Sequence, residues 1–192
     1  MLETIIGWDE QIFYWINHDW SNPVLDVVLP FFRERKSWIP LYLFLIVFMA
    51  YRFRKKGAIF IFAALLTVGA SDLLSSRIIK PSVERLRPCR QEQLDVELRA
   101  RCGSGFSFTS SHATNHFAIA SFFILTMANH YRWTKHLWWL WALTISIGQI
   151  YVGVHFPFDI LCGSMLGIAI GTLGARLYSR SNPIPEFVPA SP

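Results

Sequence analysis

The sequence predicts an all-α membrane protein, a polytopic bundle of five long helices preceded by short N-terminal helices. Hydrophobic residues make up 53% of the 192 residues and charged residues only 16%, a composition typical of membrane proteins. Five apolar runs each have about the length that a hydrocarbon layer of roughly 30 Å requires of a helix. The runs lack the alternation of apolar and polar residues that a transmembrane β-barrel needs.

The N-terminal part predicts two short helices. Residues 2–16 carry apolar side chains at helical spacing, with Asp9, Glu10 and Gln11 opposite them, which predicts a helix lying in the headgroup layer. Residues 23–32 begin with a proline and are too short to cross a bilayer comfortably. The N-terminus has acidic and no basic residues before its apolar positions, so it lacks the pattern of a secretory signal. Insertion is therefore expected to rely on the later segments.

The long helices are expected at residues 37–53, 57–79, 112–130, 136–153 and 157–178. Gly163, Gly167 and Gly171 recur every four residues in the last run, which predicts close packing against another helix. Residues 1–180 are expected to form one membrane-embedded domain, and residues 181–192, rich in proline, a disordered tail.

Five spans that alternate in direction bring the loops around residues 80–111 and 151–158 to the same side, together with the N-terminal helices. The net charge of +5 does not indicate nucleic-acid binding, because the basic residues fall in short clusters between apolar runs. Compact basic loops on the opposite side are expected to be cytoplasmic. This orientation places the two loops in the periplasm of a bacterial inner membrane.

The three cysteines leave the redox state open. Cys89 and Cys102 bracket one polar loop, and they can form a disulfide if that loop faces an oxidising compartment. Cys162 lies alone in an apolar run.

Polar residues at the ends of two runs predict an anion site. Lys80 ends one run and Arg87 follows seven residues later, and both are cationic donors that suit phosphate oxygens. Ser110 and Ser111 precede the next run, where the free amides of a helix N-terminus favour a negative charge. His112 stands beside this turn, where an imidazole can donate or accept a proton.

His155 and Asp159 form a second pair at the start of the last run. Pro157 between them suits the first turn of a helix, so the carboxylate can reach back to one ring nitrogen. This contact fixes the tautomer and orients the other nitrogen, as a nucleophilic histidine requires. Phosphorus is the natural target, because a phosphohistidine intermediate divides hydrolysis into two steps.

Each of these residues has an ordinary alternative. A cation at the membrane edge can snorkel to headgroups, a serine can simply cap a helix, and His116, His130 and His136 are expected to be structural. Asp72, inside the second run, can be functional or can pair with Arg77. Two histidines and an aspartate could bind zinc or iron, but the surrounding arginines would oppose a cation. Anion binding without a metal or other cofactor is therefore predicted.

At these residues the sequence resembles the type-2 phosphatidic acid phosphatase family, integral-membrane relatives of bacterial acid phosphatases and vanadium haloperoxidases. The first motif of that family, K-x6-R-P, is matched by Lys80, Arg87 and Pro88. The second, P-S-G-H, appears as T-S-S-H at residues 109–112. The third, S-R-x5-H-x3-D, keeps His155 and Asp159 but has Gly148 and Gln149 where serine and arginine are expected.

The resemblance covers about residues 60–175 and implies a metal-independent lipid phosphatase with a six-helix core, in which helix 23–32 would be partly embedded. It implies that His155 attacks phosphorus, that Asp159 orients it, and that His112 protonates the leaving alkoxide and later activates water. The residues implied to hold the phosphoryl oxygens are Lys80, Arg87, Ser110 and Ser111, with Gln149 in place of the arginine.

Gln149 can donate hydrogen bonds to a phosphoryl oxygen but cannot neutralise its charge, and a charge-assisted bond is roughly twice as strong as a neutral one. Arg85, Arg90 or Arg101 could compensate. The expected substrate is a lipid phosphate: phosphatidic acid, phosphatidylglycerol phosphate, an isoprenyl pyrophosphate or a lipid A phosphate. Transfer to an acceptor alcohol is a close variant. A non-catalytic protein that binds anionic lipids through a degenerate site is the alternative from another class, although lipid binding has no need of an oriented histidine.

Overall fold

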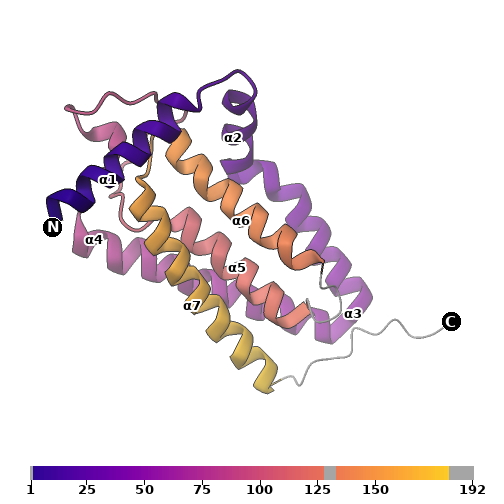
Figure 1. The fold of residues 1–192 in the computed structure, drawn as a ribbon. Coiled ribbons are helices and arrows are strands. Elements are labelled where there is room, and N and C mark those ends of the chain that lie inside the picture. Colours follow the sequence, from indigo (N-terminus) through magenta and orange to yellow (C-terminus); the bar gives the residue numbers. More distant parts are fainter. Residues whose placement is uncertain (1, 128–132, 182–192) are drawn as a thin grey trace.

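The structure is a computed structural model that describes residues 2–127 and 133–181 (Figure 1). All regular secondary structure in these residues is helical, as the sequence predicts. The predicted tail falls outside the described residues except for Ser181, and so does His130.

The helices follow one another in a simple order, with short π-helical and 3-10 segments (η) between some of them. They are α1 (Leu2–Tyr14), η1 (Trp15–Asp19), α2 (Leu25–Arg33), α3 (Arg35–Asp72), η2 (Leu73–Ile79), α4 (Lys80–Val83), η3 (Pro88–Arg90), α5 (Ser111–Met127), α6 (Thr134–Tyr151) and α7 (Pro157–Ser181).

The long helix α3 consists of two helical halves that meet at Arg54, whose backbone has a non-helical φ of 48° and ψ of −124°. The break expected between the runs 37–53 and 57–79 is therefore confirmed. Gly57 lies where the halves approach each other, because a Cβ added there would be 2.0 Å from the carbonyl oxygen of Met49. The segments η2 and α4 then prolong the second half to Val83.

Among the residues that the structure describes, two helical segments are long and apolar enough to cross a membrane, Lys36–Val83 and Pro157–Ser181. Both carry large apolar side chains that face outward, such as Phe44, Leu65 and Met165, each more than 60% exposed. Outward-facing apolar surface of this kind suits contact with lipid. The expected count of five crossings stays a prediction.

Helix α5 lies at the centre of the bundle, in contact with α3, α6 and α7 (Figure 1). The predicted small-residue face of α7 is confirmed, because it packs directly on α5. A Cβ added to Gly167 would be 2.3 Å from the carbonyl oxygen of Thr114, and one added to Gly171 would be 2.2 Å from that of Ala118. Only glycine allows the two backbones to come this close.

One N-terminal residue differs from the sequence prediction. Asp9 was expected on the polar side of the first helix, but it is only 6% exposed, while Trp8 is 62% exposed. Asp9 points into the protein because it forms an ion pair with Arg85. Helical periodicity shows which residues share a face, but it does not show which face meets another element.

Candidate functional site

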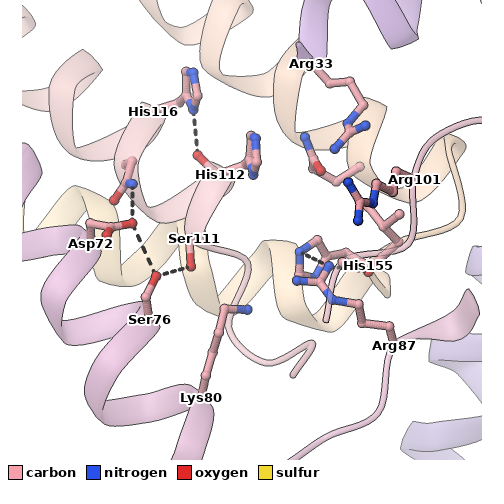
Figure 2. A pocket seen from close by; sticks show the side chains of 14 residues that line it. Arg33, Asp72, Ser76, Lys80, Arg87, Arg101, Ser111, His112, His116 and His155 are labelled. Carbon is pink, nitrogen blue, oxygen red and sulfur yellow. Dashed lines mark hydrogen bonds between the residues drawn. The ribbon is translucent and has the colours of Figure 1, made fainter. Parts of the chain in front are cut away.

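A cavity of about 430 Å³ opens between α2, the end of α3, the η2–α4 segment, α5, α6 and the loops that precede α5 and α7. Six of the eight predicted site residues line it, and Figure 2 shows several of their side chains turned toward a common space. These six are Lys80, Arg87, Ser111, His112, Gln149 and His155. Side chains from all three motifs therefore meet in one place.

His155 is 2% exposed and is held through both ring nitrogens. Its Nε2 lies 3.1 Å from Nη1 of Arg87, and its Nδ1 lies 3.3 Å from Oδ2 of Asp159. Because a guanidinium can only donate, Nε2 must be the unprotonated nitrogen, and Nδ1 then carries the proton that it donates to Asp159. The nitrogen with the electron pair therefore accepts from Arg87, and both residues line the cavity.

The carboxylate of Asp159 lies behind the imidazole and is fully buried. Its Oδ2 accepts from the amide of Phe156 at 2.9 Å and from the hydroxyl of Ser107. Its Oδ1 accepts from Nη1 of Arg85 at 2.9 Å. Donors on both oxygens hold the carboxylate in the orientation that the histidine needs.

Arg85 does not reach the cavity wall, although the sequence left it as one of three arginines that could compensate for Gln149. Its Nη2 lies 2.5 Å from Oδ2 of Asp9, and its guanidinium lies 4.0 Å from the ring centre of Phe156. Arg85 is therefore committed to supporting Asp159 from behind. The hydroxyl of Ser107 also donates to Asp159, and this contact was not predicted from the sequence.

Burial lowers the pKa of His155 to about 4, although the hydrogen bond and charge of Asp159 oppose this shift. The imidazole is therefore neutral at neutral pH. A neutral ring is required of a nucleophile, because protonation would occupy the electron pair on Nε2.

The two predicted cations are fixed by backbone carbonyl groups. Lys80 donates from Nζ to the carbonyl oxygens of Phe106 at 2.8 Å and Ser107 at 3.0 Å. An ammonium has three donors, so one remains for a bound anion. Arg87 donates from Nε to the carbonyl oxygen of Gly105 at 2.9 Å and from Nη1 to that of Val154 at 3.0 Å.

The two serines of the turn before His112 differ in their position, because Ser111 lines the cavity and Ser110 does not. Helix α5 begins at Ser111, whose hydroxyl lies 2.9 Å from that of Ser76 at the cavity wall. Ser110 is fully buried and does not line the cavity. Its amide donates to the carbonyl oxygen of Asp159 at 3.1 Å, and its hydroxyl accepts from the amide of Ala113. The expected contact of Ser110 with phosphate stays a prediction.

Position 149 is an uncharged part of the cavity wall. Gln149 is 1% exposed, and neither polar atom of its side-chain amide has a hydrogen-bond partner among the described residues. A buried amide without partners costs free energy, about 1–3 kcal/mol per unpaired group. Its placement at the wall leaves it ready to bind a polar group that enters the cavity.

Two arginines that belong to none of the three motifs also line the cavity (Figure 2). They are Arg33 at the end of α2 and Arg101 in the loop before α5. Arg101 was one of the candidates for compensation, whereas Arg33 was missed. The only hint of Arg33 was its position just after the short helix, on the predicted side of the site. Arg90, the third candidate, is exposed and lies off the wall.

A disulfide joins Cys89 and Cys102, which settles the pairing that the sequence left open. The bridge closes the loop that carries Arg101 and Gly103 to the cavity and that starts just after Arg87.

Within the described residues, no group of three His, Cys, Asp or Glu side chains is placed to hold a metal ion. The arrangement can bind a tetrahedral anion between cations. Three imidazoles line the same cavity, those of His112, His155 and His116, the last of which was expected to be structural.

Comparison with known proteins points to one family. A model of the PAP2 superfamily matches residues 56–183. A lipid A 4'-phosphatase from Bacteroides thetaiotaomicron is 31% identical over 172 residues, which cover 87% of this chain and 75% of that protein.

Two solved structures share the fold. The crystal structure of Aquifex aeolicus LpxE matches with a TM-score of 0.63 and 28% identity, over 86% of this chain and 93% of that one. A transmembrane PAP2-type phosphatidylglycerolphosphate phosphatase from Bacillus subtilis matches in fold, with a TM-score of 0.71 at 22% identity, over 96% of this chain and 90% of that one. The family resemblance predicted from the motifs is confirmed: the chain belongs to the PAP2 superfamily and is a membrane phosphatase.

Proposed function

We propose that the protein removes a phosphate from a membrane lipid through a covalent intermediate on His155. The observation that carries this proposal is the geometry of His155, a neutral imidazole at the cavity wall with Nδ1 on Asp159 and an unprotonated Nε2. Nε2 accepts from Arg87, and it becomes free to attack when Arg87 turns to a phosphoryl oxygen instead. Cations at the same wall supply the positive charge that the phosphoryl oxygens need, which supports a reaction without a metal.

The reaction takes place in two steps. Nε2 of His155 attacks phosphorus, the bond to the lipid oxygen breaks, and His112 gives its proton to that oxygen. Water then attacks the phosphohistidine, His112 takes a proton from the water, and the phosphorus–nitrogen bond breaks to release inorganic phosphate. Lys80, Arg87 and the amide of Gln149 hold the phosphoryl oxygens, and Asp159 stabilises the charge that develops on the ring.

The test is phosphate release by purified protein in detergent with EDTA present, followed by trapping in a denaturing alkaline quench. We expect turnover that the chelator does not change, and a phosphoenzyme that is labile in acid and stable in base, as a phosphoramidate bond is. His155→Gln should abolish both, whereas His136→Gln, away from the cavity wall, should change neither. Turnover by His155→Gln would overturn the proposed mechanism.

For the substrate, we propose a lipid whose phosphate is carried by a polar sugar headgroup, as in lipid A. The names of relatives support this choice, and so does one wall of the cavity. Asp72 lies there about two turns before Lys80, with Oδ1 accepting from Asn115 at 2.9 Å and from Ser76 at 3.2 Å. A carboxylate inside an apolar segment usually serves a site. Hydroxyl and amide groups of a sugar are suitable partners for this wall, whereas an isoprenyl chain is not.

A substrate panel can test the headgroup. We expect a higher kcat/KM for bisphosphorylated lipid A than for undecaprenyl diphosphate, and Asp72→Asn should raise KM for lipid A alone. Ser82→Ala provides a control, because Ser82 is exposed, on the same helical segment and off the cavity. A preference for undecaprenyl diphosphate that Asp72→Asn leaves unchanged would contradict the sugar headgroup, but not the phosphatase activity.

We further propose that the site faces the periplasm of a bacterial inner membrane. The disulfide between Cys89 and Cys102 supports this orientation, because such bonds persist in oxidising compartments. The proposal can be tested with single cysteines in a Cys162→Ser background. A membrane-impermeant maleimide should label a cysteine at the exposed loop residue Glu92 in intact spheroplasts, but not one at Lys55.

A further inference from the structure

One corner of the cavity is polar but uncharged at the position where the family motif has an arginine. Gln149 presents there a buried amide with no hydrogen-bond partner among the described residues. An amide can donate to an oxygen anion but adds no charge. A phosphoryl group bound against this corner therefore needs a cation from another part of the chain.

Arg33 is placed to provide that cation. It is the last residue of α2, and it lines the same cavity as Gln149 and His155. Figure 2 shows its side chain extending toward the space that His112, Arg101 and His155 also border. The guanidinium thus enters the site from a helix that carries none of the three motifs.

The packing of α2 on α6 explains why Arg33 comes so close. Gly148 precedes Gln149 on α6, and a Cβ added to it would lie 3.3 Å from the carbonyl oxygen of Leu29 and 3.6 Å from Cβ of Arg33. The glycine lets the last turn of α2 lie against position 148. The side chain of Arg33 therefore starts beside Gly148, the neighbour of Gln149 in the chain, and lines the same cavity as Gln149.

Electrostatics support the same placement. Burial lowers the pKa of Arg87, the charge of Asp159 opposes this shift, and the charges of Arg90 and Arg33 add to it. The guanidinium groups of Arg33 and Arg87 therefore act on each other across the cavity. Like charges held together in this way favour an anion between them, because it relieves their repulsion.

We propose that Arg33 binds the phosphoryl group directly, and that Arg33 and Gln149 together form the cationic and hydrogen-bonding corner opposite Lys80. This proposal rests on the proposed function, since it assigns a further residue to the same reaction. It differs from the sequence expectation, which looked for compensation in Arg85, Arg90 or Arg101. A planar guanidinium also suits bidentate binding of phosphate oxygens.

The first experiment removes the charge. We expect Arg33→Gln to lower kcat/KM by roughly 100-fold, as the loss of one preorganised donor for transition-state charge commonly does. The same change should weaken binding of vanadate, an analogue of the five-coordinate phosphoryl group, more than it weakens binding of inorganic phosphate. Lys36→Gln is the matched control, because Lys36 is an exposed cation three residues away that does not line the cavity.

The second experiment moves the charge across the corner. The double variant Arg33→Gln with Gln149→Arg exchanges the two side chains. It has the arginine on α6 and the glutamine on α2. We expect this exchange to recover at least about tenfold of the lost kcat/KM, because the charge again lies at the same corner. Gln149→Arg alone should raise activity little, since Arg33 already supplies the charge.

The outcomes separate this inference from the proposed mechanism. Full activity of Arg33→Gln in a protein whose His155→Gln variant is inactive would overturn the role of Arg33 and leave the mechanism standing. If Arg33→Gln lowers the melting temperature, Arg33→Lys decides, because lysine keeps the stem and the charge. A loss with lysine as large as with glutamine would then overturn the proposal, and partial activity supports it.

Discussion

Asp9 and Asp159, far apart in the chain, are joined through a single guanidinium. Nη2 of Arg85 lies 2.5 Å from Oδ2 of Asp9, and Nη1 lies 2.9 Å from Oδ1 of Asp159. Asp9 also accepts at 2.7 Å from the amide of Phe158, at the start of α7. The N-terminal helix is therefore part of the structure that fixes the buried carboxylate behind His155.

Removing Asp9 should affect the chemical step more than binding. Asp9→Ala leaves Arg85 with one carboxylate and loosens the orientation of Asp159. Loss of such an outer partner typically costs roughly 10- to 100-fold, so we expect kcat to fall by about tenfold with KM nearly unchanged. Steady-state kinetics measure this split. Glu3→Ala, on the exposed side of α1, is the control, and an equal effect of both changes would contradict a positioning role.

The protonation of His155 can be observed directly. Because burial lowers its pKa to about 4, we expect the ring to stay neutral as pH falls from 8 to 5. The pKa of a histidine in the unfolded chain is about 6.5, whereas the pKa of His155 in the folded protein is about 4. Between these two pH values the unfolded chain binds the proton and the folded protein does not, so the free energy of unfolding falls as the pH is lowered. Nitrogen-15 NMR of histidine-labelled protein in micelles should show an unprotonated Nε2 at pH 6, and a titration midpoint near 6.5 would contradict it.

The disulfide should matter both for stability and for the site. A bridge across a loop of about this length contributes roughly 3 kcal/mol, chiefly by restricting the unfolded chain. We expect the double variant Cys89→Ser with Cys102→Ser to unfold at lower temperature and to show a raised KM, because the loop carries Arg101 to the cavity. Melting curves and kinetics check both effects.

Cys162→Ser provides the control for the disulfide, since Cys162 is a free thiol on α7. Reducing agent should reproduce the effect of the double variant in the wild-type protein and in Cys162→Ser. If reduction left both the melting temperature and KM unchanged, the bridge would have no role in shaping the site.

The sequence predicted the helices well because long apolar runs are strong local signals. The run 157–178 corresponds to α7 and the run 136–153 to α6, with boundaries that differ by a few residues. The motif spacing also brought Lys80, His112 and His155 to one cavity, since alternating spans share their loops.

Contacts between elements could not be predicted in the same way. Arg33 and Asp9 belong to helices outside the motifs, and each reaches the site through packing or an ion pair that a linear pattern does not contain. Arg85 looked equivalent to Arg101 in the sequence, yet Asp9 and Asp159 hold it behind the site. A buried carboxylate attracts the nearest cation, and only the folded chain determines which cation that is.

The glycine face of α7 provides a final test, because it positions α5 and hence His112. Gly167→Ala would place a Cβ 2.3 Å from the carbonyl oxygen of Thr114, so the two helices must move apart. We expect a loss of about 1–3 kcal/mol in stability, as for other overpacked sites, together with lower activity. Gly69→Ala is the matched change, since a Cβ at Gly69 on α3 would meet nothing within 4 Å. It should be neutral or stabilise by up to about 1 kcal/mol, so equal unfolding midpoints for the two variants would contradict close packing of α5 and α7.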